Sequence, residues 1–240
     1  MSVPLRTVQL NEANAFLKKY PEVLYVDLLI ADMNGVVRGK RIERTSLHKV
    51  YEKGINLPAS LFALDINGST VESTGLGLDI GDADRICYPI PGTLSIEPWQ
   101  KRPTAQLLMT MHEIEGEPFF ADPREVLANV VRKFDELGLT ICAAFELEFY
   151  LIDQDNVNGR PQSPRSPVSG KRPVSTQVYL IDDLDEYVDC LQDILKARKS
   201  RAFRLTPSSR KAPRRSSKST CITSPTRSRL ATTRCCSSVW

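Results

Sequence analysis

The stretch AAFELEFYLID, residues 143–153, places two acidic residues inside one of the most apolar runs of this 240-residue chain. In a strand, alternate side chains share a face, so Glu146 and Glu148 point to one side while Phe145 and Leu147 point to the other. A rise of about 3.3 Å per residue puts the two acidic positions roughly 6.6 Å apart along the backbone. Two explanations stay open, a strand with one wet face or a pair of oxygen ligands for Mg²⁺ or Mn²⁺ that neutralises their repulsion.

The segments around this stretch predict an α+β fold. Residues 122–138 predict a helix with Asp122 as cap, Pro123 at its first position, Glu125 completing a capping box and Gly138 as its end. The apolar residues of this helix recur at helical spacing and predict one buried face: Val126, Leu127, Val130, Val131, Phe134 and Leu137. A long loop rich in Pro, Ser and Gly follows the opening stretch, and residues 175–197 then predict a strand and a second amphipathic helix.

The amino-terminal part predicts mainly strands. Residues 23–42 contain two β-rich runs around Asn34-Gly35, the strongest short hairpin signal. Residues 45–54 predict a short helix that Gly54 closes, and LFALDINGST, residues 61–70, predicts a strand entering a turn. We expect a β-rich domain up to residue 114 and a second domain from residue 115.

Charge and composition divide the chain again near position 199. Eleven of the 32 Lys and Arg residues lie between Lys199 and Trp240, where there is no Asp or Glu, so residues 1–198 hold 21 basic and 29 acidic residues, a net of −8. The six cysteines show no CxxC spacing, which favours reduced thiols over a zinc site or a disulfide framework. Without a run of about 20 apolar residues or a signal-peptide pattern, we expect a cytoplasmic protein with no membrane contact.

Several ordered motifs resemble those of the glutamine synthetase family. FELEFYLID, preceded by a helix that starts with DPREVL and by GLTICAA, is similar to the family's metal-binding strand. YVDLLIADMNGVVRGKRI resembles its amino-terminal β-grasp domain, and DINGST, GDADRICYPIPGT and PWQKRPTAQLL follow in the family's order. The resemblance covers about residues 15–198. It implies a β-grasp domain over 15–114 and the start of a catalytic half-barrel domain of α/β type over 115–198.

The resemblance implies an ATP-dependent ligase that phosphorylates the γ-carboxylate of glutamate and lets an amine, ammonia or a polyamine, displace the phosphate. Glu146 and Glu148 match metal ligands of the family, for Mg²⁺ or Mn²⁺. Homo-oligomers with the site between subunits are expected for such enzymes. The residues that bind ATP and glutamate in the family lie beyond the matched part, in a half that carries a histidine-containing segment. The two histidines of this chain, His48 and His112, both precede the predicted metal strand.

Two residues resemble the amine-binding positions of the family's γ-glutamylpolyamine synthetase branch. Asn67, in NGST, stands where glutamine synthetases usually carry an Asp that helps bind ammonium, and a neutral amide attracts a small cation less strongly. Asp84 matches an acid that lines the amine pocket across a subunit boundary. Without the resemblance, Asn67-Gly68 is equally typical of a plain turn.

The segment 199–240 does not resemble the family and allows two interpretations. Its mixture of Arg, Ser, Thr and Pro without apolar periodicity favours a coding-frame change near Lys199, with an irregular or disordered tail and a truncated, inactive ligase as the result. The alternative is a non-catalytic protein whose basic tail binds nucleic acid or anionic surfaces, because such a composition neutralises phosphates and cannot bury a core.

Overall fold

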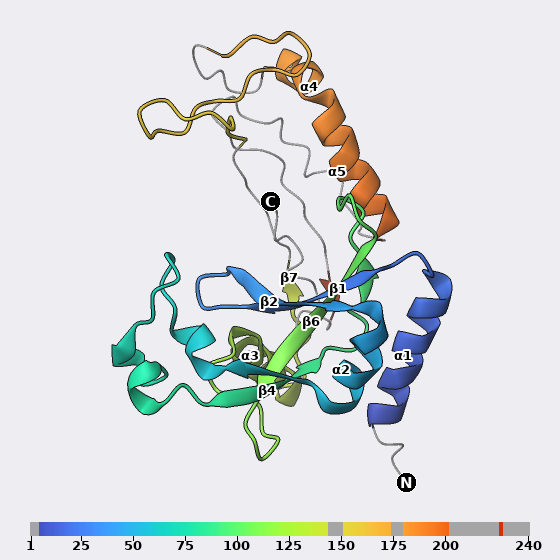
Figure 1. Ribbon diagram of the computed structural model, residues 1–240, viewed down its shortest axis with the longest axis vertical. Coiled ribbons are helices and arrows are strands. Elements are labelled where there is room, and N and C mark those ends of the chain that lie inside the picture. The colour runs from blue at the N-terminus through green and yellow to red at the C-terminus, as the bar shows by residue number, and fades with distance from the viewer. Residues whose placement is uncertain (1–4, 144–150, 174–179, 202–225, 228–240) are drawn as a thin grey trace. The chain divides into compact units, whose positions relative to one another are not determined.

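The computed structural model describes residues 5–143, 151–173, 180–201 and 226–227. The chain divides into two compact units, Met1–Ile141 with Ser228–Trp240, and Cys142–Arg227. The first unit contains a mixed sheet with helices, and the second contains mainly loops and helices, so the predicted α+β class holds at this level (Figure 1). The narrower assignment of a β-grasp domain to residues 15–114 stays a prediction.

The sheet of the first unit has the strand order β2-β1-β6-β4-β3, with β5 paired to β6. Its strands are β1 (Tyr25–Ala31), β2 (Val37–Glu43), β3 (Ile55–Pro58), β4 (Asp84–Pro89), β5 (Ser95–Ile96) and β6 (Thr104–His112). The pair β1 and β6 is parallel and the other pairs are antiparallel. The predicted hairpin is confirmed, because β1 and β2 pair from Tyr25–Glu43 to Ala31–Val37 around a turn in which Gly35 has φ 75°.

Two helices build the core against one face of this sheet. Helix α1 (Leu5–Lys19) and helix α2 (Leu47–Lys53) lie side by side in Figure 1, and His48 Nε2 lies 2.6 Å from Asn14 Oδ1. Alternate residues of the two central strands join them in one apolar cluster, among them Val26, Leu28 and Ile30 of β1 and Leu107, Met109 and Met111 of β6. The predicted end of α2 at Gly54, with φ 71°, is confirmed.

The strand predicted at the start of residues 61–70 is wrong. Residues Ala59–Ala63 form a 3-10 helix in which all five residues are buried, and the chain then enters a turn through a single bridge between Leu64 and Thr70. A short apolar run has no periodicity that distinguishes a strand from a buried helical turn, and here the local 3-10 bonds satisfy the backbone. The predicted turn itself is present.

Helix α3 (Pro123–Glu136) begins and ends where the sequence predicts, but its apolar face is not buried. The Asp122 side chain accepts a hydrogen bond from the backbone N–H of Arg124, and Gly138 has φ 68°. No residue of α3 is buried, and the side chains of Leu127 and Phe134 are each 40% exposed. Helical spacing indicates which residues share a face, but it does not supply a partner for that face.

The capping box predicted for Glu125 is also wrong. Its Oε1 lies 3.0 Å from the hydroxyl oxygen of Thr110 on β6, whose single proton it shares with Oδ2 of Asp122. The backbone N–H of Asp122, which a capping box would satisfy, donates instead to the carbonyl oxygen of Phe119 at 3.1 Å. The turn before the helix therefore provides the acceptor that the sequence pattern assigns to Glu125.

In the second unit, the long loop predicted after the opening stretch is held by side chains. Arg172 donates to Asp153 at 2.8 Å and to the carbonyl oxygen of Ser163 at 2.7 Å. The predicted helix is split at Tyr187, with φ −124° and ψ 25°, into α4 (Asp182–Glu186) and α5 (Val188–Ser200). Strands β7 (Cys142–Ala143) and β8 (Thr226–Arg227) form a two-residue pair. The rest of the predicted tail and the strand before α4 lie outside the described residues.

Candidate active site

Asn67 lies in a compact turn that Asp65 organises. Oδ1 of Asp65 accepts hydrogen bonds from the backbone N–H groups of Asn67 at 2.8 Å and Ser69 at 2.9 Å. The backbone of Asp65 closes the same turn, since its N–H donates to the carbonyl of Ser69 and its carbonyl accepts from Gly68. Gly68 has φ 85°, which suits glycine. The Asn67 side chain is exposed, so the turn fixes the backbone and presents the amide outward.

The hairpin between β1 and β2 holds this turn from the side. The side-chain amide of Asn34 donates to the carbonyl oxygen of Leu64 at 2.7 Å, thirty residues away in sequence. Arg38 reaches the same segment, because a Cβ built on Gly68 would lie 3.9 Å from Arg38 Nη1. Asn34 of the hairpin therefore bonds the residue that leads into the Asn67 turn, and the guanidinium of Arg38 lies close to Gly68 within it.

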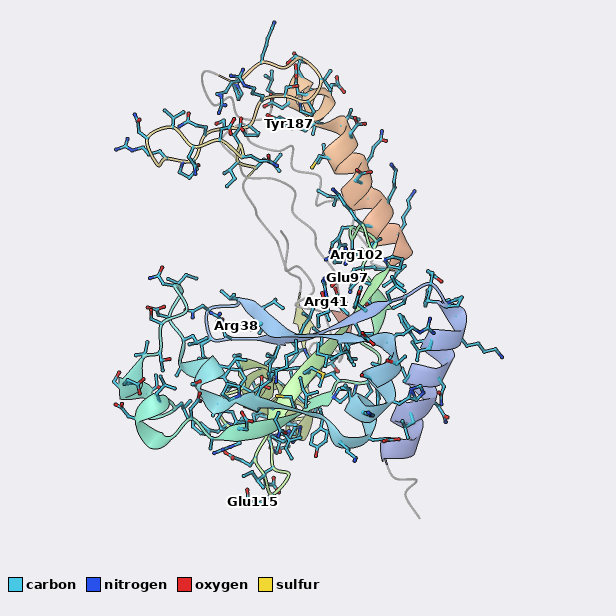
Figure 2. All side chains as sticks on the ribbon, viewed as in Figure 1. Arg38, Arg41, Glu97, Arg102, Glu115 and Tyr187 are labelled. Atoms are coloured by element: carbon cyan, nitrogen blue, oxygen red, sulfur yellow. The ribbon has the colours of Figure 1, made fainter. Side chains whose placement is uncertain are left out.

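A buried carboxylate orders both of these hairpin side chains. Asp32 has a fully buried side chain and accepts from the backbone N–H groups of Asn34 at 2.8 Å and Val36 at 2.9 Å. Its other oxygen accepts from Nε of Arg38 at 2.7 Å. Figure 2 shows Arg38 on the hairpin, and Arg41 farther along the same strand near Glu97. Because a buried charge must be paired, Asp32 fixes the orientation of Arg38.

Asp84, the second predicted amine residue, begins β4 opposite Pro58 at the end of β3, and its side chain is exposed. Just before it, Asp82 has φ 44° and accepts from the backbone N–H of Ser60 at 3.2 Å. These contacts connect the Asp84 strand to the amino-terminal end of the 3-10 helix Ala59–Ala63, which leads to the Asn67 turn. No hydrogen bond between Asn67 and Asp84 occurs in the part of the chain that the structure describes.

The segment that contains Asn67 and Asp84 has an excess of acidic residues, which the sequence motifs do not reveal. Between Gly54 and Asp84 there are five acids and no Lys, Arg or His. The acids are Asp65, Glu72, Asp79, Asp82 and Asp84. Counting charge along this segment alone would have found it. An uninterrupted acidic segment attracts cations and raises their local concentration.

The predicted metal ligands Glu146 and Glu148 lie outside the described residues. Among the residues that are described, no group of three or more His, Cys, Asp or Glu side chains could hold a metal ion. No described helix is long and apolar enough to cross a bilayer. The metal ligands and the cytoplasmic location both stay predictions.

Comparison with known proteins gives this geometry a context. Residues 120–211 match the family model for the glutamine synthetase catalytic domain. The chain is 42% identical over 185 residues to the γ-glutamylputrescine synthetase PuuA of Escherichia coli, an alignment that covers 77% of this chain and 39% of the relative. The resemblance to the glutamine synthetase family is confirmed. The family match begins near the predicted domain boundary at 115 and extends past 199, whereas the first compact unit ends at Ile141, so the domain bounds stay a prediction.

Further relatives are glutamate–amine ligases as well. A glutamate–isopropylamine ligase of a Pseudomonas species is 32% identical over 147 residues, which is 60% of this chain and 32% of that protein. The chain thus spans about a third to two fifths of the length of these curated relatives.

Two solved structures share the fold of this chain. A glutamine synthase homologue superposes with a TM-score of 0.67 over 85% of this chain and 44% of its own, at 18% identity. A ligand-free GmaS structure gives a TM-score of 0.64 over 88% of this chain and 45% of its own, also at 18% identity. The fold is therefore glutamine synthetase-like.

Proposed function

We propose that this chain carries the amino-terminal part of an ATP-dependent ligase that joins the γ-carboxylate of glutamate to an amine. The 42% identity to γ-glutamylputrescine synthetase carries the proposal, because it extends over 77% of the chain. The substrates would be glutamate, ATP and the amine. The enzyme would be a cytoplasmic homo-oligomer whose site lies between subunits.

A diamine or polyamine fits the chain better than ammonia. Asn67 supplies a neutral amide rather than a carboxylate, and it is exposed on a rigid turn. The segment Gly54–Asp84 holds five acids and no basic residue of its own, so it stays acidic with Arg38 and Lys40 of the hairpin against it, and this excess favours a ligand that carries more than one positive charge. In this proposal Asn67 and Asp84 contact the amine, with Asp84 acting across a subunit boundary.

Glu146 and Glu148 would hold Mg²⁺ or Mn²⁺. Carboxylate oxygens are the hard ligands these ions prefer, so the donor chemistry of the two residues fits. When bound, such ions shield phosphate charge and orient the transferred group. Two carboxylates alone seldom retain Mg²⁺ without further ligands, which leads us to propose that the 240 residues by themselves are a truncated form without ligase turnover.

The test uses two proteins assayed side by side for phosphate release from ATP with glutamate, Mn²⁺ and either putrescine or ammonium. One is the 240-residue chain, for which no turnover is expected. The other joins residues 1–198 to the corresponding remainder of the E. coli γ-glutamylputrescine synthetase. We expect this hybrid to turn over and to prefer putrescine, and we expect turnover to disappear in its Glu146→Ala and Glu148→Ala variants.

The outcomes separate the parts of the proposal. A folded hybrid without turnover would contradict the ligase assignment. A strong preference of the hybrid for ammonium would mean that the ligase makes glutamine. Turnover by the 240-residue chain that depends on both glutamates would show that this chain completes a site without further residues.

The basic segment supports a second candidate function. Eleven Lys and Arg residues and no acid lie between Lys199 and Trp240. A polycationic segment of this composition binds nucleic acid through phosphates and releases counterions, so its affinity falls steeply with salt. Binding of random-sequence DNA by the full chain, measured at increasing salt, tests this function. No binding at low salt would exclude it.

A further inference from the structure

We infer that Asn34 is a positioning residue that holds the Asn67 turn in place. The inference deepens the proposed function and rests on it for the role of Asn67 toward an amine. Asn34 contacts no predicted substrate residue directly. It acts through the carbonyl of Leu64, the residue just before the turn, to which its side-chain amide donates at 2.7 Å.

The turn alone fixes its own shape but not its place on the unit. All four hydrogen bonds that close it run between Asp65 and the next four residues, so they move with it. The flanking bridge between Leu64 and Thr70 is also local. The Asn34 amide, from the hairpin, is a contact that ties this segment to a distant part of the sheet.

Asp32 makes Asn34 a rigid support. The backbone N–H of Asn34 donates to the fully buried Asp32 carboxylate, which also binds Val36 and Arg38. The Asn34 side chain thus starts from a turn whose backbone makes two hydrogen bonds to one carboxylate oxygen. Arg38, held by the same carboxylate, lies close to the turn at Gly68. A shift of the hairpin would therefore shift the Asn67 amide.

The first experiment measures amide hydrogen exchange by NMR in the ¹⁵N-labelled 240-residue chain. Asn34→Ala removes the donor and keeps the backbone bond to Asp32. We expect the amides of Asn67 and Ser69 to exchange about fivefold faster, the loss of one hydrogen bond, while the amide of Leu107 in the core strand is unchanged. Unchanged exchange at the turn, or equal acceleration at Leu107, would overturn the inference.

Two matched variants test whether the faster exchange comes from the lost Asn34 hydrogen bond or from any substitution in this turn. Asn34→Gln keeps an amide donor on a longer side chain and should restore most of the protection. Met33→Ala changes a neighbouring turn residue that is 61% exposed, and it should leave the exchange of Asn67 and Ser69 unchanged. Faster exchange in Met33→Ala as well would contradict a specific role for Asn34.

The second experiment follows the side-chain amide signal of Asn67 during titration with putrescine and with ammonium. We expect putrescine to shift the signal, Asn34→Ala to raise the half-saturation concentration about fivefold, and Asn34→Gln to recover it. If Asn34→Ala accelerates amide exchange in the turn but leaves the half-saturation concentration for putrescine unchanged, the positioning role is wrong. If putrescine shifts nothing in the unsubstituted chain, the amine role proposed for Asn67 fails, while selective loosening of the turn still supports Asn34 as its support.

Discussion

The hydroxyl of Thr110 donates a hydrogen bond to Oδ2 of Asp122, with 3.0 Å between the two oxygens, and Asp122 is only 1% exposed. The same carboxylate accepts from the backbone N–H groups of Met111 and Arg124, each at 2.9 Å. Asp122 therefore caps helix α3 and joins it to the central strand β6.

Asp122→Ala should lower the free energy of unfolding by about 2–4 kcal/mol. Loss of a helix cap costs about 1 kcal/mol, and the buried N–H of Met111 would lose its side-chain acceptor, while the hydroxyl of Thr110 keeps Glu125 as an acceptor. Urea denaturation followed by circular dichroism measures the change. Asp135→Ala, on the same helix and exposed, is the control and should change stability by less than about 0.5 kcal/mol. Equal effects of the two substitutions would contradict the bridging role of Asp122.

The free energy of unfolding should depend on pH in a way that reflects the protonation of Asp122. Burial raises the pKa of Asp122 above its ordinary value of 3.8, and the hydrogen bonds from Met111, Arg124 and Thr110 oppose this shift only partly. The folded chain thus binds this proton more tightly than the unfolded chain. The resulting stabilisation is complete below the unfolded pKa and is lost as pH rises through the folded pKa.

The stability difference between the unsubstituted chain and Asp122→Ala should therefore narrow as pH rises from about 4 toward 7. Urea midpoints of both proteins across this range measure it. Titrating groups away from Asp122 affect both proteins alike and cancel in the difference, whereas the neighbouring Glu125, whose charge also raises the pKa of Asp122, does not cancel. A difference that widens with pH would mean that the hydrogen bonds outweigh burial and that the folded pKa of Asp122 is lowered.

Local signals in the sequence predicted most element boundaries, and distant contacts decided the rest. Asn34-Gly35, Gly54 and Gly138 marked a hairpin and two helix ends because their turn chemistry lies within a few residues. The capping box predicted for Glu125 does not form, because the Glu125 side chain bonds the hydroxyl of Thr110 instead, twelve residues before Asp122. No pattern within the α3 sequence could reveal this competition.

The candidate site also combines residues that the sequence predicts with a contact that only the structure shows. Asn67 and Asp84 were predicted from ordered motifs that resemble a family. The structure confirms the turn at Asn67 and shows in addition that Asp84 begins strand β4, while their role toward an amine stays a prediction. The support from Asn34 joins residues that are thirty positions apart, through a backbone carbonyl that every residue possesses. Such a contact leaves no mark in a single sequence, so only the folded chain reveals it.

Cysteine reactivity should follow burial. Burial raises the pKa of Cys87 to about 12, so almost no thiolate exists at neutral pH, and the side chain is fully buried. Burial also raises the pKa of Cys190, which is only half-buried. Iodoacetamide at about pH 8 should therefore alkylate Cys190 much faster than Cys87. Peptide mass spectrometry measures both rates, and unfolding in concentrated urea, the control, should make them similar. Faster alkylation of Cys87 in the folded chain would contradict the packing of β4.

Gly39→Ala should destabilise the first unit far more than Gly35→Ala, although both residues lie in the same hairpin. Gly39 has φ 151°, and a Cβ there would lie 1.7 Å from the carbonyl oxygen of Leu28 on the paired strand β1. Because backbone atoms cannot give way as a side chain can, we expect a loss of more than about 3 kcal/mol. A Cβ on Gly35, with φ 75°, meets nothing within 4 Å, so only the left-handed backbone costs energy, about 1 kcal/mol.

Urea denaturation of the two glycine variants, compared with the unsubstituted chain, measures this difference. Gly35→Ala is the matched control, because it adds the same methyl group to the same hairpin without the clash. Similar losses in both variants would mean that β2 moves away from Leu28 at low cost. The hairpin would then be too loose to hold Arg38 against the turn at Gly68, and the support inferred for Asn67 would depend on Asn34 alone.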